Sequence, residues 1–233
     1  MSDSIVQSQH GPRMTLRRMP FSYEKPGKAH WNSGKPEFSQ IVNAASLAMP
    51  YLEPHLIRSM RRARPKITDP ILLEQLDQYV YQEGQHYQQH KKYNDSIASE
   101  YPCVHGIEEV LAADYKRLDK KSLRFRLAYA EGFESMALAI GNMLITDREF
   151  LFGNSDSTVT SLVLWHFIEE IEHKNVPLMY SITCMVVTFG GLRGSCMQPS
   201  IFFGAVGKLT SAFCSKMGCG KISRAVGVSP VCC

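Results

Sequence analysis

Two short stretches of the chain place a glutamate three residues before a histidine. The first is "EGQHYQQH" (83–90), with Glu83 and His86, and the second is "EIEH" (170–173), with Glu170 and His173. Three residues is close to one helical turn, so each pair projects from one face of a helix. A carboxylate beside an imidazole can bind a divalent metal ion. One such pair is commonly a solvated helix face, whereas two pairs indicate a shared site.

Two further glutamates lie among apolar neighbours. They are Glu53 in "AMPYLEPHLIRSM" (48–60) and Glu131 in "LAYAEGFESMALAIG" (127–141). A carboxylate on an apolar helix face must be paired or bound to a cation, because an isolated buried charge is costly. Glu134 follows Glu131 by three residues on the same face. We assign Glu131 as the ligand and keep Glu134 as the alternative.

The elements that must position these residues are helices. Apolar residues recur every three or four positions from about residue 37 to 182, which is the helical period. The pattern predicts long helices over about 37–63, 68–98, 120–146 and 157–185, with a shorter helix over about 107–118. Short connections make the first two long helices antiparallel, and likewise the last two. We therefore predict an all-α fold: a ferritin-like antiparallel four-helix bundle with a short linking helix.

Local signals mark where these helices begin and bend. In "TDP" (68–70), Thr68 or Asp69 can cap the second helix and Pro70 suits its first turn. The stretch "FGNSDS" (152–157) is typical of a turn followed by a helix cap. Pro50 and Pro54 fall inside the first helix beside Glu53, and we expect them to kink or break it.

The composition changes twice along the chain. Residues 1–36 are rich in Pro, Gly, Ser and Lys without a lasting period, which predicts an irregular N-terminal arm. Residues 37–189 form the predicted helical bundle. Residues 190–233 are rich in Gly, Ser, Cys and Lys and lose the helical period, which predicts a weakly structured tail.

The predicted helices place the four glutamate positions at compatible depths. Glu53 lies roughly 13 residues before the first turn and Glu83 roughly 14 after it, about 20 Å along each helix. Glu131 lies roughly 20 residues before the turn near 153, and Glu170 and His173 roughly 17 to 20 after it. All of them can therefore meet inside the bundle.

One Glu from each of two helices, with Glu-x-x-His from each of the other two, is the ligand set of di-iron and di-manganese carboxylate bundles. The sequence therefore predicts two divalent metal ions, iron in the first place and manganese or zinc as alternatives. The predicted ligands are Glu53, Glu83, His86, Glu131, Glu170 and His173.

Two histidines share the faces that carry these ligands. His90 lies one turn after His86, and His166 lies four residues before Glu170. We expect them to orient the ligands, with a role as additional ligands left open. Glu169 and Glu172 are expected at the edge of the face.

Three blocks of the sequence resemble, in order and spacing, a family of ferritin-like proteins labelled predicted metal-dependent hydrolases. The blocks are "PYLEPHLIRSMRRARPKITDPILLEQLDQYVYQEGQHYQQHKKYN" (50–94), "AYAEGF" (128–133) and "LWHFIEEIEHKNV" (164–176). The resemblance implies metal ligands at the same six positions, and His90 and His166 also match the family's motifs. Members of that family usually continue with helical sequence where this chain enters its Cys- and Gly-rich tail.

Three functions follow from such a site. The carboxylate-rich ligand set favours a di-iron enzyme that uses dioxygen to oxidise a small, apolar organic substrate. The family label favours metal-dependent hydrolysis by a metal-activated water. The third is a non-catalytic metal-binding protein or a degenerate family member.

The charge, the apolar runs and the cysteine spacing limit which kinds of partner and metal site we expect. A formal net charge of +4, from 26 basic and 22 acidic residues, does not indicate a nucleic-acid partner. The most apolar run, "VPLMYSITCMVVTFGG" (176–191), is too short for a transmembrane span. The spacing of the seven cysteines matches no zinc site. Without a secretory signal in the sequence, we expect a cytoplasmic protein. We also expect a small-molecule substrate, and the protein could form a homodimer.

Overall fold

Helices make up all the regular secondary structure of the residues that the computed structural model describes, which are 14–23, 27–98, 101 and 104–173. The all-α prediction is therefore confirmed. The predicted continuation of the last helix and the tail 190–233 lie outside the described residues. The elements are α1 (Pro36–Ala63), the 3₁₀ turn η1 (Arg64–Lys66), α2 (Pro70–Ile97), α3 (Val104–Leu118), α4 (Leu123–Thr146), α5 (Arg148–Phe152) and α6 (Ser157–His173).

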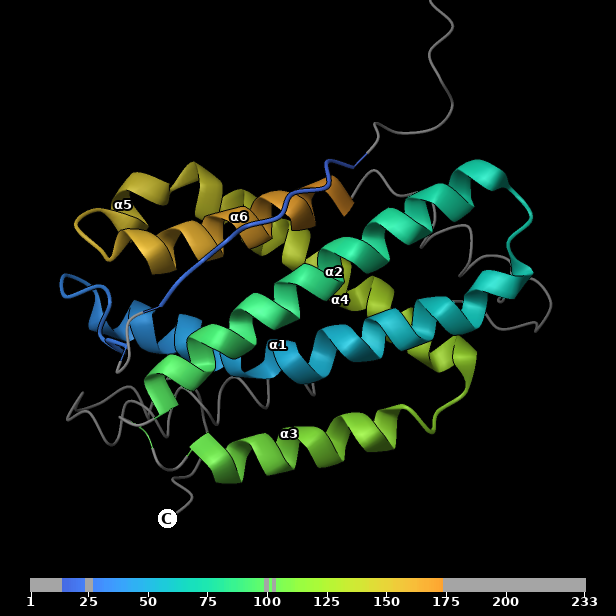
Figure 1. The fold of residues 1–233 in the computed structure, drawn as a ribbon, viewed down its shortest axis with the longest axis horizontal. Coiled ribbons are helices and arrows are strands. Elements are labelled where there is room, and N and C mark those ends of the chain that lie inside the picture. Colours follow the sequence, from blue (N-terminus) through green and yellow to red (C-terminus); the bar gives the residue numbers. More distant parts are fainter. Residues whose placement is uncertain (1–13, 24–26, 99–100, 102–103, 174–233) are drawn as a thin grey trace, which may run out of the picture.

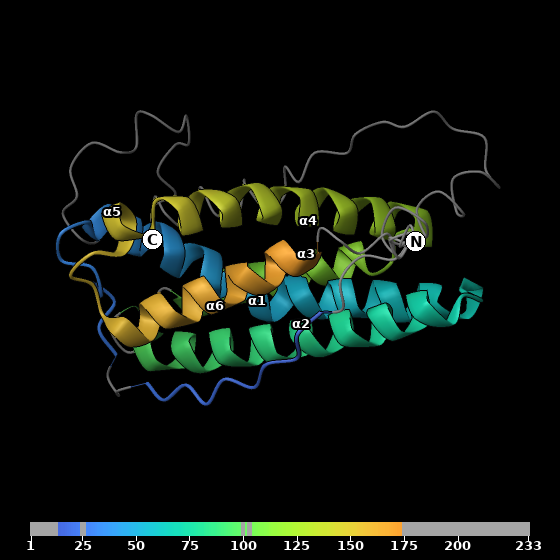
Figure 2. The same cartoon turned by 90° about the horizontal axis from the view of Figure 1, so that it is seen from above.

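Four long helices pack as two pairs (Figure 1). Helix α1 packs mainly on α2, and α4 mainly on α6, while contacts of α1 with α4 and of α2 with α6 join the pairs. Short connections make each pair antiparallel, and α3 packs against α1. The view from above shows α1 and α6 passing between α2 and α4 (Figure 2). The interior between the four helices is where the predicted ligands must meet. The ferritin-like topology itself stays a prediction.

Side-chain caps fix where three of the helices begin. Asp69 accepts hydrogen bonds from the backbone N–H groups of Ile71 and Leu72 at the start of α2, with Pro70 in the first turn. Ser122 caps α4, and Asp156 accepts from two backbone N–H groups at the start of α6. Each cap satisfies donors that the first turn leaves without an intrahelical partner. The caps therefore fix the register of the ligand-bearing helices.

The two prolines of α1 do not break the helix, contrary to one of the outcomes expected from the sequence. Helix α1 is assigned without interruption from Pro36 to Ala63, with Pro50 and Pro54 inside it. Each proline removes one backbone hydrogen bond. Packing of α1 against α2, α3 and α4 supports the helix where these hydrogen bonds are missing. Glu53, directly before Pro54, thus stays on the inner face and is fully buried.

The N-terminal residues lie against the bundle. Residues 14–23 form no helix or strand, and they run along α2 and α6 (Figure 1). The Gln89 side chain of α2 donates to the backbone carbonyl of Met19 at 2.9 Å. Within the described residues, no helix is both long and apolar enough to cross a bilayer.

Candidate metal centre

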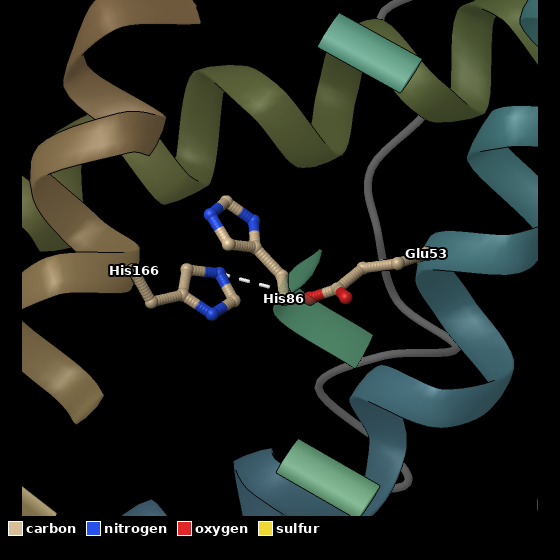
Figure 3. Close-up of side chains that lie close together, drawn as sticks. All are labelled: Glu53, His86 and His166. Carbon is tan, nitrogen blue, oxygen red and sulfur yellow. Dashed lines mark ion pairs between the residues drawn. The ribbon is translucent and has the colours of Figure 1, made fainter. Parts of the chain in front are cut away.

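Two clusters of acidic and histidine side chains lie inside the bundle. The first contains Glu53 from α1, His86 from α2 and His166 from α6; the second contains Glu83 from α2, Glu134 from α4, and Glu170 and His173 from α6. In each cluster, one N or O atom per residue lies within 4.8 Å of the others. Figure 3 shows the first cluster, with the Glu53 carboxylate and the two imidazole rings directed toward one another.

Glu170 lies between the two clusters. Its Oε1 is 3.1 Å from His166 Nε2 and 3.5 Å from His86 Nδ1. Its other oxygen, Oε2, is 3.4 Å from His173 Nδ1. One carboxylate oxygen therefore faces each cluster, which is the placement of a carboxylate that bridges two metal ions.

Three of the four cluster carboxylates are buried without hydrogen-bond donors among the described residues. No carboxylate oxygen of Glu53, Glu83 or Glu170 has a hydrogen-bond partner among the described residues. The same holds for His86 Nδ1. All four residues are at most 1 % exposed. Buried charges without partners are strongly destabilising unless a cation compensates them. Oxygen and imidazole donors of this kind suit divalent first-row metals, so the residues fit the predicted pair of ions.

His86 is held so that one ring nitrogen is left for a metal. Its Nε2–H donates to Glu169 Oε2 at 2.9 Å. Because a neutral imidazole carries one proton, Nδ1 then presents its lone pair to the cluster. A carboxylate that receives the outer N–H of a metal-binding histidine fixes its tautomer and raises its basicity.

His173 is held in the same way. Its Nε2–H donates to Gln82 Oε1 at 3.0 Å. The orientation of the Gln82 amide is set by its other end, where Nε2 donates to Glu172 Oε2 at 3.1 Å and to the Thr15 carbonyl at 3.0 Å. His173 Nδ1 therefore faces the second cluster, 3.2 Å from Glu134 Oε2 and 3.5 Å from Glu83 Oε1.

A chain of hydrogen bonds sets the tautomer of His166. The Asn94 amide donates to the Ser46 carbonyl, which leaves Asn94 Oδ1 to accept from the Ser46 hydroxyl at 2.6 Å. Ser46 Oγ can then only accept from His90 Nδ1–H, at 2.8 Å, so His90 Nε2 accepts from His166 Nδ1–H at 2.7 Å. The His166 Nε2 lone pair is thereby directed at the first cluster. His90 acts as the orienting residue expected from the sequence.

Arg17 of the N-terminal segment holds the acidic groups behind two of these histidines. Its guanidinium is 3.2 Å from Glu169 Oε1 and 2.5 Å from Glu172 Oε1. Glu169 contacts His86, and Glu172 contacts the Gln82 amide that contacts His173. One cation thus fixes the supports of histidines in both clusters.

The carboxylates of the site differ in proton affinity. Burial, followed by the charges of Glu170 and Glu134, raises the pKa of Glu53 and that of Glu83 well above the ordinary carboxyl value. Burial also opposes ionisation of Glu170, but the three cluster imidazoles outweigh it and lower the pKa of Glu170 well below that value. Without metal, Glu170 therefore gives up its proton far more readily than Glu53 or Glu83 does.

The imidazoles differ as well. Burial disfavours protonation of His173, but the carboxylates of Glu170 and Glu134 outweigh it and raise the pKa of His173 well above the ordinary value. Burial and the neighbouring His86 lower the pKa of His166 to about 4. His166 is therefore neutral near pH 7 and ready to bind a metal, whereas His173 must first release a proton.

The structure brings together five of the six ligands assigned from the sequence. Glu131 is the exception, since it is only half-buried on α4 and belongs to neither cluster. The alternative, Glu134, takes its place, and its Oε1 accepts a hydrogen bond from the Tyr79 hydroxyl at 2.6 Å. Both glutamates lie near one face of α4, and the packing of α4 on its neighbours decides which one points inward. His166, expected mainly to orient ligands, lies inside the first cluster.

Several supporting residues were not found from the sequence. Glu169, expected at the edge of the helix face, is fully buried against His86. The two consecutive acidic residues 169 and 170 inside an apolar helix are the signal that could have indicated it. Gln82, Tyr79 and Arg17 carried no such signal.

The comparison with family models agrees with this geometry. The model described as "Predicted metal-dependent hydrolase" matches residues 15–190. The chain belongs to this family. The match begins at the segment that carries Arg17 and includes both clusters, so the family's extent covers the whole candidate site and its supports. The chain matches no curated protein and no solved structure.

Proposed function

We propose that the chain binds two divalent metal ions, iron in the first place, and uses them with dioxygen to oxidise a small organic substrate. The observation that carries this proposal is the set of buried carboxylate oxygens of Glu53, Glu83 and Glu170, which lack hydrogen-bond donors among the described residues. Bound cations would replace the protons that Glu53 and Glu83 otherwise retain, and would give these oxygens partners in a dry interior.

The clusters suggest which residues hold which ion. Glu53, His86 and His166 would hold one ion, and Glu83, Glu134 and His173 the other. Glu170 would serve both, because its oxygens face different clusters. The result is a dinuclear site with four carboxylates and three imidazoles.

A ferrous pair held there would supply two of the four electrons that reduce dioxygen to water, the substrate would supply the other two, and an external reductant would return the pair to the ferrous state. The chain's own residues do the remaining work. Glu169, Gln82 and His90 hold the three imidazoles with their free nitrogens inward. The apolar core around the clusters excludes water, which strengthens every electrostatic interaction inside.

Hydrolysis is the second candidate, and the family's description favours it. A divalent ion in either cluster could lower the pKa of a bound water and polarise a carbonyl or phosphoryl group. Zinc or manganese would serve this chemistry as well as iron. A third reading, metal binding without catalysis, shares the same ligands. The ferritin-like topology, a homodimer and a cytoplasmic location are further predictions from the sequence.

The two chemistries separate by their need for oxygen. The full chain is loaded with ferrous iron without oxygen and then mixed with air-saturated buffer. Oxygen consumption with a change in the optical spectrum is expected, whereas the chain loaded with zinc shows neither. A matched control is Glu131→Gln, which changes a glutamate of α4 outside both clusters. Ester or phosphoester hydrolysis by the zinc form, with no oxygen consumption by the iron form, would establish hydrolysis instead.

A further inference from the structure

A pocket lies between α1, α4 and α6 beside the candidate metal centre. Its volume is about 240 Å³, and its wall contains Val42, Met49, Phe133 and Val163 together with His166. Its lining residues range from Met143, which is 49 % exposed, to Ala137, which is 2 % exposed, and they include His166 at 3 %. The pocket therefore leads from the surface to a side chain of the first cluster.

The pocket offers nothing to a charged or strongly polar molecule. None of the described residues that line it is Asp, Glu, Lys or Arg. Its polar side chains, Ser46, His90 and His166, are hydrogen-bonded to one another. A polar group entering this space would lose its water without gaining a partner. The lining therefore selects an apolar occupant.

The pocket also distinguishes the two metal positions. Its wall includes His166 of the first cluster but none of Glu83, Glu134 and His173 of the second. On the side of the second cluster, Tyr79 is hydrogen-bonded to Glu134 and its ring lies 4.8 Å from that of His173. An occupant would consequently approach the ion held by Glu53, His86 and His166.

We propose that this pocket is the substrate site, and that the substrate is an uncharged, apolar organic molecule somewhat larger than benzene. The proposal rests on the function proposed above, since it names the substrate class of that centre. Cavities of about 150 Å³ with similar apolar walls bind benzene, whereas drug-sized ligands fill roughly 300–1,000 Å³. A protein partner would not reach the buried His166, but a small molecule would.

The pocket is tested directly by titrating the metal-free full chain with toluene and monitoring the protein's methyl groups by NMR. Toluene binding is expected to saturate and to change the chemical shifts of the methyl groups of Val42, Met49 and Val163. Benzoate at the same concentrations is expected not to bind. No saturable toluene binding, or equal binding of benzoate, would overturn the proposal. So would a pocket closed by a second copy of the chain, seen as a dimer that toluene neither enters nor dissociates.

Filling the pocket should remove toluene binding. Ala45→Leu and Ala137→Leu each place extra methyl groups among the lining residues, and we expect the toluene affinity to fall by about tenfold or more. Using both variants guards against one that fails to fold. Ala112→Leu, at an exposed position of α3, is the matched control and should bind toluene normally. Unchanged binding in both folded pocket variants would place toluene elsewhere.

Manganese then tests the distance to the metal centre. In the chain loaded with Mn²⁺, the protons of bound toluene should relax faster than in the metal-free chain. Binding without faster relaxation would contradict the placement beside His166. If the chain binds no Mn²⁺ at all, the proposed function fails, whereas the toluene titration of the metal-free chain still decides the pocket.

Discussion

Two networks of ionisable side chains share helix α1, one partly exposed and one buried, and they are built in opposite ways. In the first, which we call the Asp119 network, the Asp119 carboxylate is 2.7 Å from His55 Nδ1, 2.7 Å from Arg58 Nη2 and 3.1 Å from Arg126 Nη2. Arg126 also donates to Ser59 Oγ at 3.0 Å. Asp119 thus faces three basic groups that the chain itself provides, while His55 Nε2 and Arg126 Nη2 form no hydrogen bond among the described residues.

The candidate metal centre has an excess of acceptors instead. Glu53, Glu83 and Glu170 lack hydrogen-bond donors among the described residues, and their neighbours are mostly imidazole nitrogens held with their lone pairs inward. The comparison shows that α1 carries one network whose opposite charges the chain itself provides and another in which acceptors outnumber donors. Mutations in the two networks should therefore have different effects.

The largest effect is expected at the carboxylate shared by the two clusters. Glu170→Gln removes the charge that faces both clusters. We expect the affinity for both ions to fall by more than roughly 100-fold, which is the largest loss usual for mutating a residue that only hydrogen-bonds to a metal ligand. Isothermal titration with Mn²⁺ measures this loss. Retention of one tight ion would show that Glu170 binds only one metal.

Mutations in the Asp119 network should lower the free energy of unfolding rather than the affinity for metal. Asp119→Asn leaves the buried Arg126 without its anion and should lower the free energy of unfolding by about 3 kcal/mol. Glu53→Gln, on α1, should leave the free energy of unfolding of the metal-free chain unchanged or higher. Urea denaturation of both variants checks this contrast. A similar loss in the two variants would remove the distinction between the networks.

The supports behind the histidines should have intermediate effects. Glu169→Gln turns the acceptor of the His86 N–H into a neutral amide, and we expect a loss of about 10- to 100-fold in metal affinity. Arg17→Gln should act in the same direction by releasing Glu169 and Glu172. Long-range ¹H–¹⁵N spectra of the histidine rings report the tautomer independently of the metal. An unchanged His86 tautomer together with unchanged affinity would assign these residues to packing alone.

Metal uptake should release protons. The pKa of Glu53, Glu83 and His173 is raised in the metal-free chain, so these groups hold protons above the ordinary values of 4.5 for Glu and 6.5 for His. Metal competes with those protons, and its affinity should therefore rise with pH, by about tenfold per pH unit for each proton released. Titration calorimetry in buffers of different ionisation enthalpy counts the protons. Release of none would contradict the assigned ligands.

The smallest effect distinguishes the two glutamates of α4. Glu131→Gln should leave metal affinity unchanged, because Glu131 lies outside both clusters. Glu134→Gln should weaken binding of the ion near His173. Manganese titration of the matched pair measures the difference. A loss in Glu131→Gln alone would restore the assignment made from the sequence.

The helices and most of the clustered residues could be predicted because they depend on local rules. The helical period, the caps at Asp69 and Asp156, and the repeated Glu-x-x-His spacing are all local features of the sequence. The choice between Glu131 and Glu134 was not predictable, since both lie near one face and a small rotation of α4 exchanges them. Contacts such as Arg17 with Glu169 join residues 152 positions apart, so no local pattern encodes them.

Metal content tests the central claim most directly. The full chain is loaded anaerobically with ferrous iron, freed of unbound metal and analysed for iron and protein, beside Glu170→Gln treated identically. The account predicts about two ions per chain, with nearly complete loss in the variant. Retention of no metal by the native chain, or of equal metal by both proteins, would contradict it.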